Sequence, residues 1–330
     1  MSKAKLMISP HIHCGQSTTG IMLDVLIALL PATVAGAVIF GWRALLVVAV
    51  CLISCVGFEA LFNLLTKKDL TIIDLSAAVT GLLLALNLPA NIPLWQCVVG
   101  SLFAIVVVKC LFGGIGCNLV NPAIAARVFM LVAFAEVAKA AFPALSVGAV
   151  DTVATATPLS PEGTMPSLLD LFLGLRGGAI GETCVAALLL GGIYLLIRRV
   201  ITWHTPVAFI ATVFVFSLFL EMDYSLLQNA GQTVFANVLA MLSQGAVAAL
   251  SKVMCGGVVI GAIFMATDYT TSPSTPWGKF LFGVGCGLMT CLIRLSAAEG
   301  VSYAILFMNI VNPYIKSWTK FKVFGVGGAK

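Results

Sequence analysis

The sequence predicts an all-helical integral membrane protein with about ten transmembrane helices. Of its 330 residues, 60% are apolar and 9% are charged, and the mean hydropathy is +1.09. Soluble domains have about 45–50% apolar and about 25% charged residues, so the composition excludes a soluble, disordered or collagen-like chain. Because a transmembrane helix takes about 20 residues, the apolar runs leave room for about ten spans joined by short loops.

The expected spans follow the apolar runs in chain order. A further helix over 233–250 is interrupted by Asn237, Ser243 and Gln244, which favours a half-buried or interfacial position. We therefore expect one membrane domain with a segment 1–20, a five-helix half 21–138, a loop 139–179, a second half 180–316 and a tail 317–330. The ten spans are 21–40, 43–65, 74–88, 94–112, 121–138, 180–199, 204–221, 252–267, 278–295 and 300–316.

The basic residues predict the orientation of these spans. Lys3 and Lys5 precede a polar stretch rather than a short apolar core, which argues against a cleaved signal peptide. With the N-terminus inside, eleven of the eighteen Lys and Arg residues fall on the inner side. The positive-inside rule thus predicts that both termini are cytoplasmic and that loop 139–179 is external. Without a basic stripe interleaved with aromatic residues, nucleic-acid binding has no support.

A weak internal repeat relates the two halves at an offset of about 180 residues. The segment 81–86, followed by Pro93, resembles 261–266, followed by Pro276, and each half later carries an Asn-Pro pair, at 121–122 and 312–313. Five spans is an odd number, so the second half is expected to be inverted relative to the first. Inverted repeats commonly hold a site near the membrane midplane that is lined by broken helices.

Three regions are more polar than their surroundings. The loop 150–159 carries a series of threonines that ends at Thr157, and it can be an ordinary Ser/Thr loop or a modification site. Asn118 and Asn121 stand at the inner entrance to the fifth span, where they can cap the next helix or bind a polar ring. Asp268 ends the eighth span and can be a functional carboxylate or a cap in water.

Other ionisable residues fall in or near the spans. Asp24 and Glu59 are candidates for an ion path, whereas Lys109, Arg127 and Arg294 can pair with them or extend toward the interface. The ten cysteines contain no Cys-x-x-Cys pair and no nearby histidine, which favours packing over metal binding. No metal site and no catalytic residue are predicted for this chain.

Several of these motifs, in order along nearly the whole chain, resemble the RnfD/NqrB family of membrane flavoprotein subunits. The resemblance rests on segments 22–31, 118–123, 151–158, 264–268 with 272–273, and 299–309. It implies a fold similar to urea transporters, with two inverted five-helix halves. Since only about twenty residues precede the first span, the chain is more similar to RnfD than to the N-terminally extended NqrB.

The family resemblance also implies flavin sites. A threonine that closes an Asp-x-x-Ser/Thr-x-Ala-Thr pattern carries FMN through a phosphoester, and here it is Thr157, with Asp151 opening the pattern and Ala154 in the usual Ser/Thr position. Asn118, Asn121 and Asp268 match positions at which NqrB-like chains hold non-covalent riboflavin. The phosphoester leaves the flavin ring free for redox work.

The expected function is electron transfer between flavins in an ion-translocating ferredoxin:NAD oxidoreductase of the cell membrane, pumping Na⁺ or H⁺. Its expected partners are the other membrane and peripheral subunits, including a second covalent-flavin subunit and iron–sulfur subunits, together with the lipid bilayer. The chain lacks a nucleotide-binding βαβ pattern, so it is not expected to be a complete enzyme by itself. The alternatives are the NqrB subunit of the sodium-pumping NADH:quinone reductase, a urea- or ammonium-type solute channel, and a purely structural membrane anchor.

Overall fold

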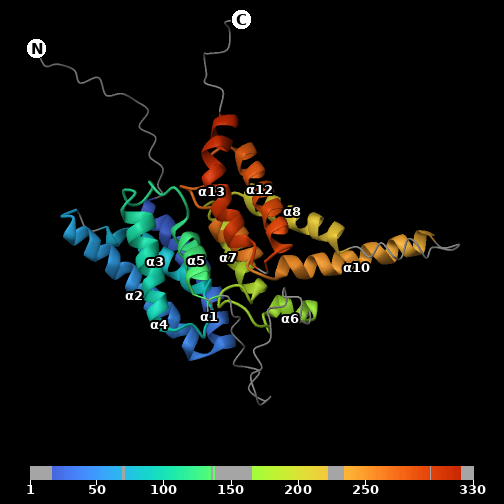
Figure 1. Ribbon diagram of the computed structural model, residues 1–330, viewed down its shortest axis with the longest axis horizontal. Helices are drawn as coiled ribbons and strands as arrows, with labels where there is room; N and C mark the ends of the chain where they lie inside the picture. The colour runs from blue at the N-terminus through green and yellow to red at the C-terminus, as the bar shows by residue number, and fades with distance from the viewer. Residues whose placement is uncertain are drawn as a thin grey trace, which may run out of the picture.

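The computed structural model describes residues 17–68, 71–134, 137, 166–221, 234–297 and 299–320, and its elements in these ranges are all helices. The helices of the first half form one group, and those of the second half form another beside it (Figure 1). Thr157 and Asp151 lie outside the described residues. The first half contains α1 (Thr18–Phe40), α2 (Trp42–Leu65), η1 (Ile72–Asp74), α3 (Ser76–Leu86), α4 (Leu94–Leu102), the π-helix η2 (Phe103–Cys110) and α5 (Pro122–Ala133).

The second half is less regular than the first. A short helix in the expected external loop, α6, precedes it. The elements of this part are α6 (Leu168–Leu173), α7 (Val185–Ile197), α8 (His204–Leu220), α10 (Val234–Met254), α11 (Val258–Ile260), the π-helix η5 (Gly261–Met265), α12 (Pro276–Arg294) and α13 (Val301–Trp318).

Local sequence explains where several helices begin. The side chain of Ser17 accepts a hydrogen bond from the N–H of Gly20 and caps α1. Asn121 and Thr275 cap α5 and α12 in the same way, and each is followed by a proline at the first helical position, where a missing N–H costs nothing. The Asn-Pro at 121–122 is thus a helix start in this structure.

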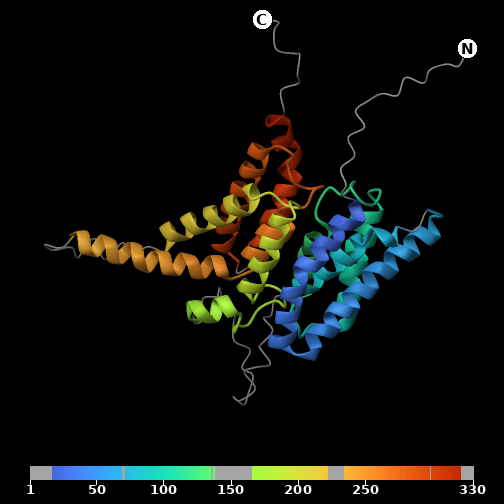
Figure 2. The same ribbon diagram turned by 180° about the vertical axis from the view of Figure 1, so that it is seen from behind.

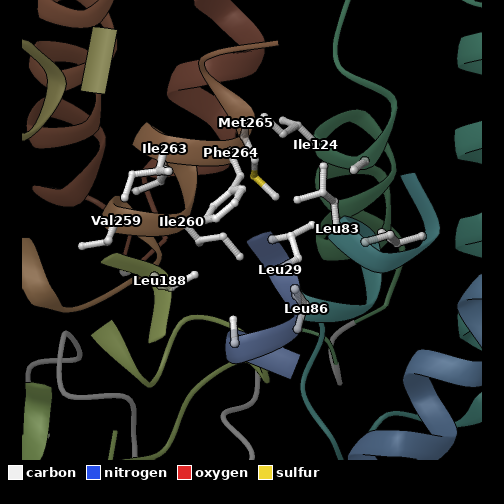
Figure 3. Close-up of a cluster of buried hydrophobic side chains, with 14 of the residues drawn as sticks. Leu29, Leu83, Leu86, Ile124, Leu188, Val259, Ile260, Ile263, Phe264 and Met265 are labelled. Atoms are coloured by element: carbon white, nitrogen blue, oxygen red, sulfur yellow. The ribbon is translucent and has the colours of Figure 1, made fainter. Parts of the chain in front are cut away.

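Two short helices, α3 and the α11–η5 pair, meet at the boundary between the halves. Almost all of their residues are buried. Figure 3 shows Leu83 from α3 and Met265 from η5 pointing toward each other, with Leu29 of α1 and Phe264 beside them. These apolar contacts join the two halves into one core.

The boundary between the halves also depends on a close approach of α1 and α7. A Cβ atom placed on Gly191 would collide with the main-chain oxygen of Ala28, so only glycine allows this helix contact. The segment between α6 and α7 completes the boundary. There the N–H groups of Ile180 and Gly181 donate to the carbonyl oxygens of Leu88 and Leu86, at 3.1 and 2.8 Å.

The lengths of the helices differ from the expected spans. Three of them, α1, α2 and α12, are long and apolar enough to cross a membrane, and the pair 241–254 and 258–265 adds a fourth if it counts as one span bent by 65°. The helices α3, α5, α7 and α8 have 11, 12, 13 and 17 residues. The described residues therefore establish a helical protein with several apolar, membrane-compatible helices, while ten spans and an inverted repeat stay predictions.

One expected boundary is wrong, and one expected loop is packed at its end. The sequence predicts separate helices over 233–250 and 252–267, but α10 continues to Met254, and the chain breaks at Cys255–Gly257, where Gly257 has a φ of 70°. The expected loop 139–179 ends in a packed segment, because Arg176 is buried and donates to the carbonyl oxygens of Glu182 and Met254, at 2.8 and 2.7 Å. The packing of this segment depends on a contact between residues far apart in the sequence, Arg176 and Met254.

The start of α1 and the end of α13 lie at the same end of the molecule (Figure 2). The turn between η2 and α5 and the turn between η5 and α12 lie at this end as well. This arrangement agrees with the expectation that Asn118, Asn121 and Asp268 share one side of the protein. The side of the membrane that this end faces stays a prediction.

Candidate functional site

A cleft between the two halves opens at the end that holds the start of α1. The cavity volume of the cleft is about 100 Å³, and the cleft is partly open to solvent. Apolar residues of α1, α3 and α7 form one part of its wall, and the turns that follow η2 and η5 form the polar part. The lining includes Met22, Val25, Ser76, Thr80, Leu83, Lys109, Asn118, Asn121, Leu195, Phe264, Thr267, Asp268, Tyr269 and Thr270.

The cleft brings Asp268 together with Asn118 and Asn121, which lie about 150 positions before it in the sequence. Asn121 is 4% exposed; its Oδ1 caps α5, and its Nδ2 donates to the main-chain oxygen of Met265 at 3.4 Å. The Oδ1 of Asn118 is buried and accepts no hydrogen bond from the described residues. Because a buried amide oxygen without a donor is costly, Asn118 offers an acceptor for a polar ligand.

Asp268 is half-buried in the turn after η5. Its Oδ2 accepts hydrogen bonds from the hydroxyls of Thr270 and Thr271, at 3.0 and 3.2 Å. Burial raises the pKa of Asp268, and the two hydroxyls partly oppose this shift. Asp268 can therefore accept a hydrogen bond when ionised and donate one when protonated, which suits a ligand that exchanges protons.

A buried ion pair supports the wall of the cleft on the side of the first half. The Nζ of Lys109 lies 2.7 Å from the Oε1 of Glu59 and 2.7 Å from the Oγ of Ser76, and the two charged side chains are 3% and 4% exposed. The hydroxyl of Thr71 donates to the same Oε1 at 2.9 Å. Because an ammonium has three N–H donors, Lys109 has one more donor to offer where it lines the cleft.

A second ion pair crosses the boundary between the halves. The guanidinium of Arg127 on α5 donates to the Oε2 of Glu299 at 2.7 Å and to the Oδ1 of Asn87 at 2.6 Å. Arg127 is 4% exposed, and Asn87 directly follows α3. This pair therefore holds the end of the short helix α3 against the start of α13.

The proposed ion-path residues, Asp24 and Glu59, lie in separate ion pairs, and neither lines the cleft. Asp24 accepts hydrogen bonds from the Tyr194 hydroxyl at 2.9 Å and from Arg198, whose Nη2 lies 3.2 Å from its Oδ2. This pair joins α1 to the end of α7. The structure gives each carboxylate a cationic partner and does not bring the two together.

Sequence reasoning gave no role to Ser76, Thr80 and Tyr269, which line the cleft. Their positions follow from the start of α3 and the turn after η5, and neither element was predicted with its observed bounds. The internal repeat was the one available signal, because it pairs the segment of α3 with that of η5, and residues at the start of the first and after the second line the cleft.

Comparison with known proteins identifies the family. The profile of the NQR2, RnfD, RnfE family matches residues 5–325. The chain is 44% identical to the D-type subunit of the Na⁺-translocating ferredoxin:NAD⁺ oxidoreductase complex of Acetobacterium woodii, over 96% of this chain and 94% of the relative. It is 39% identical to the D-type subunit of the proton-translocating ferredoxin:NAD⁺ oxidoreductase complex of Clostridium ljungdahlii, over 96% and 95%. A third relative is the D-type subunit of the ion-translocating oxidoreductase complex of Halorhodospira halophila, 32% identical over 98% and 96%. The chain therefore belongs to the NQR2, RnfD, RnfE family.

Proposed function

We propose that this chain is the D-type subunit of an ion-translocating ferredoxin:NAD⁺ oxidoreductase and that it carries electrons between two flavins. The names of the first two relatives support the activity of the complex, and the match along nearly the whole chain supports the assignment of the subunit. Because one of these relatives is named for Na⁺ and the other for protons, the pumped ion needs its own measurement. The other subunits of such a complex would bind NAD and ferredoxin.

The single observation that supports a second, non-covalent flavin is the cleft that brings together Asn118, Asn121 and Asp268. The donors and acceptors fit the polar edge of a flavin ring or its ribityl hydroxyls, because they combine an unpaired amide oxygen, a carboxyl group and a buried ammonium. A cavity of about 100 Å³ is small for a flavin ring, so part of the ring would extend beyond it at the open side of the cleft. A neutral riboflavin suits Asp268 better than a phosphorylated flavin, which its carboxylate would repel.

A bound flavin would supply one- and two-electron chemistry at this position. The residues of the chain would determine how readily it accepts electrons. Lys109 brings a positive charge to the cleft and favours negative charge on a ligand, while Glu59 limits that effect by pairing with the ammonium. Asp268 can hold or release a proton beside the ligand.

The covalent FMN at Thr157 is proposed from the motif that begins at Asp151. The denatured polypeptide should fluoresce as a flavin on a gel. Thr157→Ala should abolish this fluorescence and slow electron transfer through the complex, whereas the matched variant Thr155→Ala should keep both. A fluorescent band in Thr157→Ala would contradict the assignment, and a colourless wild-type chain would favour a solute channel.

The non-covalent flavin has a separate test. Acid denaturation of the purified complex should release riboflavin, and Asp268→Ala or Asn118→Ala should lower the amount released without changing the gel fluorescence. Asp74→Ala is the matched control, because Asp74 lies at the surface turn η1 and does not line the cleft. Unchanged riboflavin content in both cleft variants would show that the cleft does not hold it.

A further inference from the structure

The helix α13 carries two deeply buried asparagines with unpaired polar atoms. Asn309 is 1% exposed and Asn312 is 3% exposed. Neither the Oδ1 nor the Nδ2 of Asn309 has a hydrogen-bond partner among the described residues, and the Oδ1 of Asn312 has none either. Buried amides are almost always paired with protein atoms, water or an ion, so this position calls for a further component.

The orientation of Asn312 is fixed by its other amide atom. Its Nδ2 donates to the main-chain oxygen of Thr271 at 2.8 Å, so the oxygen is the free atom. Residues three apart lie on the same face of a helix, which places Asn309 and Asn312 one above the other. The two side chains are therefore close enough to contribute to one site.

The main-chain oxygen of Asn309 is a third oxygen beside these two side chains. Pro313 lies inside α13 and has no N–H, so it cannot donate to the carbonyl of Asn309 four residues earlier. The same short stretch of helix thus carries two side-chain oxygens without a partner among the described residues and one main-chain oxygen without its usual i+4 donor. They are the Oδ1 of Asn309, the Oδ1 of Asn312 and the main-chain oxygen of Asn309.

The site lies between α13 and the interrupted helix of the second half. One turn before Asn309, Ile305 packs at Gly261, the first residue of η5. One turn after it, Asn312 binds the turn that follows η5. Kinked and broken helices supply oxygen ligands for small cations in membrane transport proteins, because their carbonyls are not used by the helix.

The matching Asn-Pro of the first half shows that such amides can be satisfied by the chain itself. Asn121 uses its Oδ1 to cap α5 and its Nδ2 to bind Met265. Asn312 precedes its proline in the middle of a helix, where no cap is needed, and its oxygen stays unpaired. Of the two Asn-Pro pairs, the one in the second half is therefore the one that leaves its asparagine oxygen unpaired.

We propose that Asn309 and Asn312 form a binding site for a monovalent alkali cation, completed by water that accepts from the Nδ2 of Asn309. Neutral oxygens without a carboxylate in direct contact favour a monovalent over a divalent ion, and the described residues contain no cluster of His, Cys, Asp and Glu that could hold a metal. Asp268, linked through the hydroxyl of Thr271, is the acidic group on this side, and Lys316, whose Nζ lies 3.4 Å from the Thr270 oxygen, is the basic one. The site does not depend on a flavin in the cleft.

The test is the thermal stability of the full-length chain in nanodiscs, with NaCl, LiCl or KCl exchanged for choline chloride at constant ionic strength. A ligand that binds only the folded state raises the Tm, so at least one alkali cation should raise it by a few degrees in a saturable way. Asn309→Leu and Asn312→Leu should lose this response. Gln96→Leu, which replaces a buried amide on α4 in the other half, should keep it.

A charge-introducing variant keeps the test decisive if a leucine variant does not fold. Asn312→Asp adds a negative charge to the site and should shift the cation response to lower concentration. The proposal is overturned if the wild-type Tm is the same in choline and in every alkali chloride, which would mean that the amides hold water only. A response that survives in both leucine variants, or an unchanged midpoint in Asn312→Asp, would overturn it as well.

Discussion

The two short helices α3 and α11 begin in the same backbone conformation, but the cations near their starts bind different partners. The residue before each helix is left-handed, with a φ of 59° at Leu75 and 70° at Gly257. Near the start of α3, the ammonium of Lys109 pairs with the carboxylate of Glu59. Near the start of α11, Arg294 donates to the carbonyl oxygens of Lys252 and Cys255, at 2.8 and 2.9 Å.

The difference follows from where the preceding helix ends. The helix α10 ends at Met254, directly before the break, and the last carbonyls of a helix lack intrahelical partners. These carbonyls are natural acceptors for an arginine, and the negative end of the helix dipole favours its charge. In the first half, α2 ends at Leu65, well before α3, so no helix-end carbonyl among the described residues lies beside Lys109. The carboxylate of Glu59 binds the ammonium instead. The partner of the cation near each short helix thus follows from the position at which the preceding helix ends.

The largest effect is expected from breaking the Lys109–Glu59 pair. Glu59→Leu leaves a buried ammonium without its counter-charge and should lower the free energy of unfolding by about 3–5 kcal/mol. The double variant Glu59→Leu/Lys109→Met should recover most of this loss. Reversible unfolding in a detergent mixture measures both values.

An exposed ion pair provides the control for that experiment. Lys252 and Glu221 lie 2.8 Å apart, with side chains 30% and 36% exposed, so Glu221→Gln should cost less than about 1 kcal/mol. If Glu59→Leu costs no more than Glu221→Gln, the pair near α3 is not the buried contact described above.

A smaller effect is expected at the second break. Arg294→Met removes charged hydrogen bonds to the end of α10 and should cost about 2–3 kcal/mol. Arg294→Lys should restore part of this stability, since it keeps the charge but not the planar geometry. Equal stability of the Met and Lys variants in the same unfolding assay would show that the charge does not act on these carbonyls.

The third prediction concerns the left-handed residues. Gly257→Ala should cost about 1–2 kcal/mol, because a side chain at positive φ is strained and the new Cβ would lie 3.0 Å from the Oε2 of Glu182. Leu75→Gly removes the same strain from the first half and should be neutral or stabilising. Thermal unfolding of the two variants checks the opposite signs, and a destabilisation of equal size in both would contradict the strain argument.

The smallest effect is a pH dependence at the end of η5. Because burial raises the pKa of Asp268, the folded chain binds this proton more tightly than the unfolded chain does. Stability should therefore fall as the pH rises above about 4, the unfolded value, and level off above the folded pKa. Asp268→Asn should be more stable than the wild type at pH 8 and equal to it near pH 3, as measured by Tm. A difference that is largest in acid would reverse the sign of this argument.

The sequence was informative where the chain repeats itself. The repeat and the charge pattern predicted that Asn118, Asn121 and Asp268 lie at one end, and the cleft brings them together. The Lys109–Glu59 pair joins residues 50 positions apart on different helices, which no periodicity indicates. The break was expected at residue 251 and lies at Cys255–Gly257 instead, because the glycines at 256 and 257 also suit a continuous packed helix.

The hydrogen bonds from Ile180 and Gly181 to the end of α3 have a consequence for biosynthesis. When only the first half of the chain has been inserted into the bilayer, the carbonyl oxygens of Leu86 and Leu88 lack these donors. The residues that supply the donors are synthesised nearly a hundred codons later. An expression system that splits the gene between the halves should therefore place the cut after residue 184, so that the first fragment carries its own closing segment.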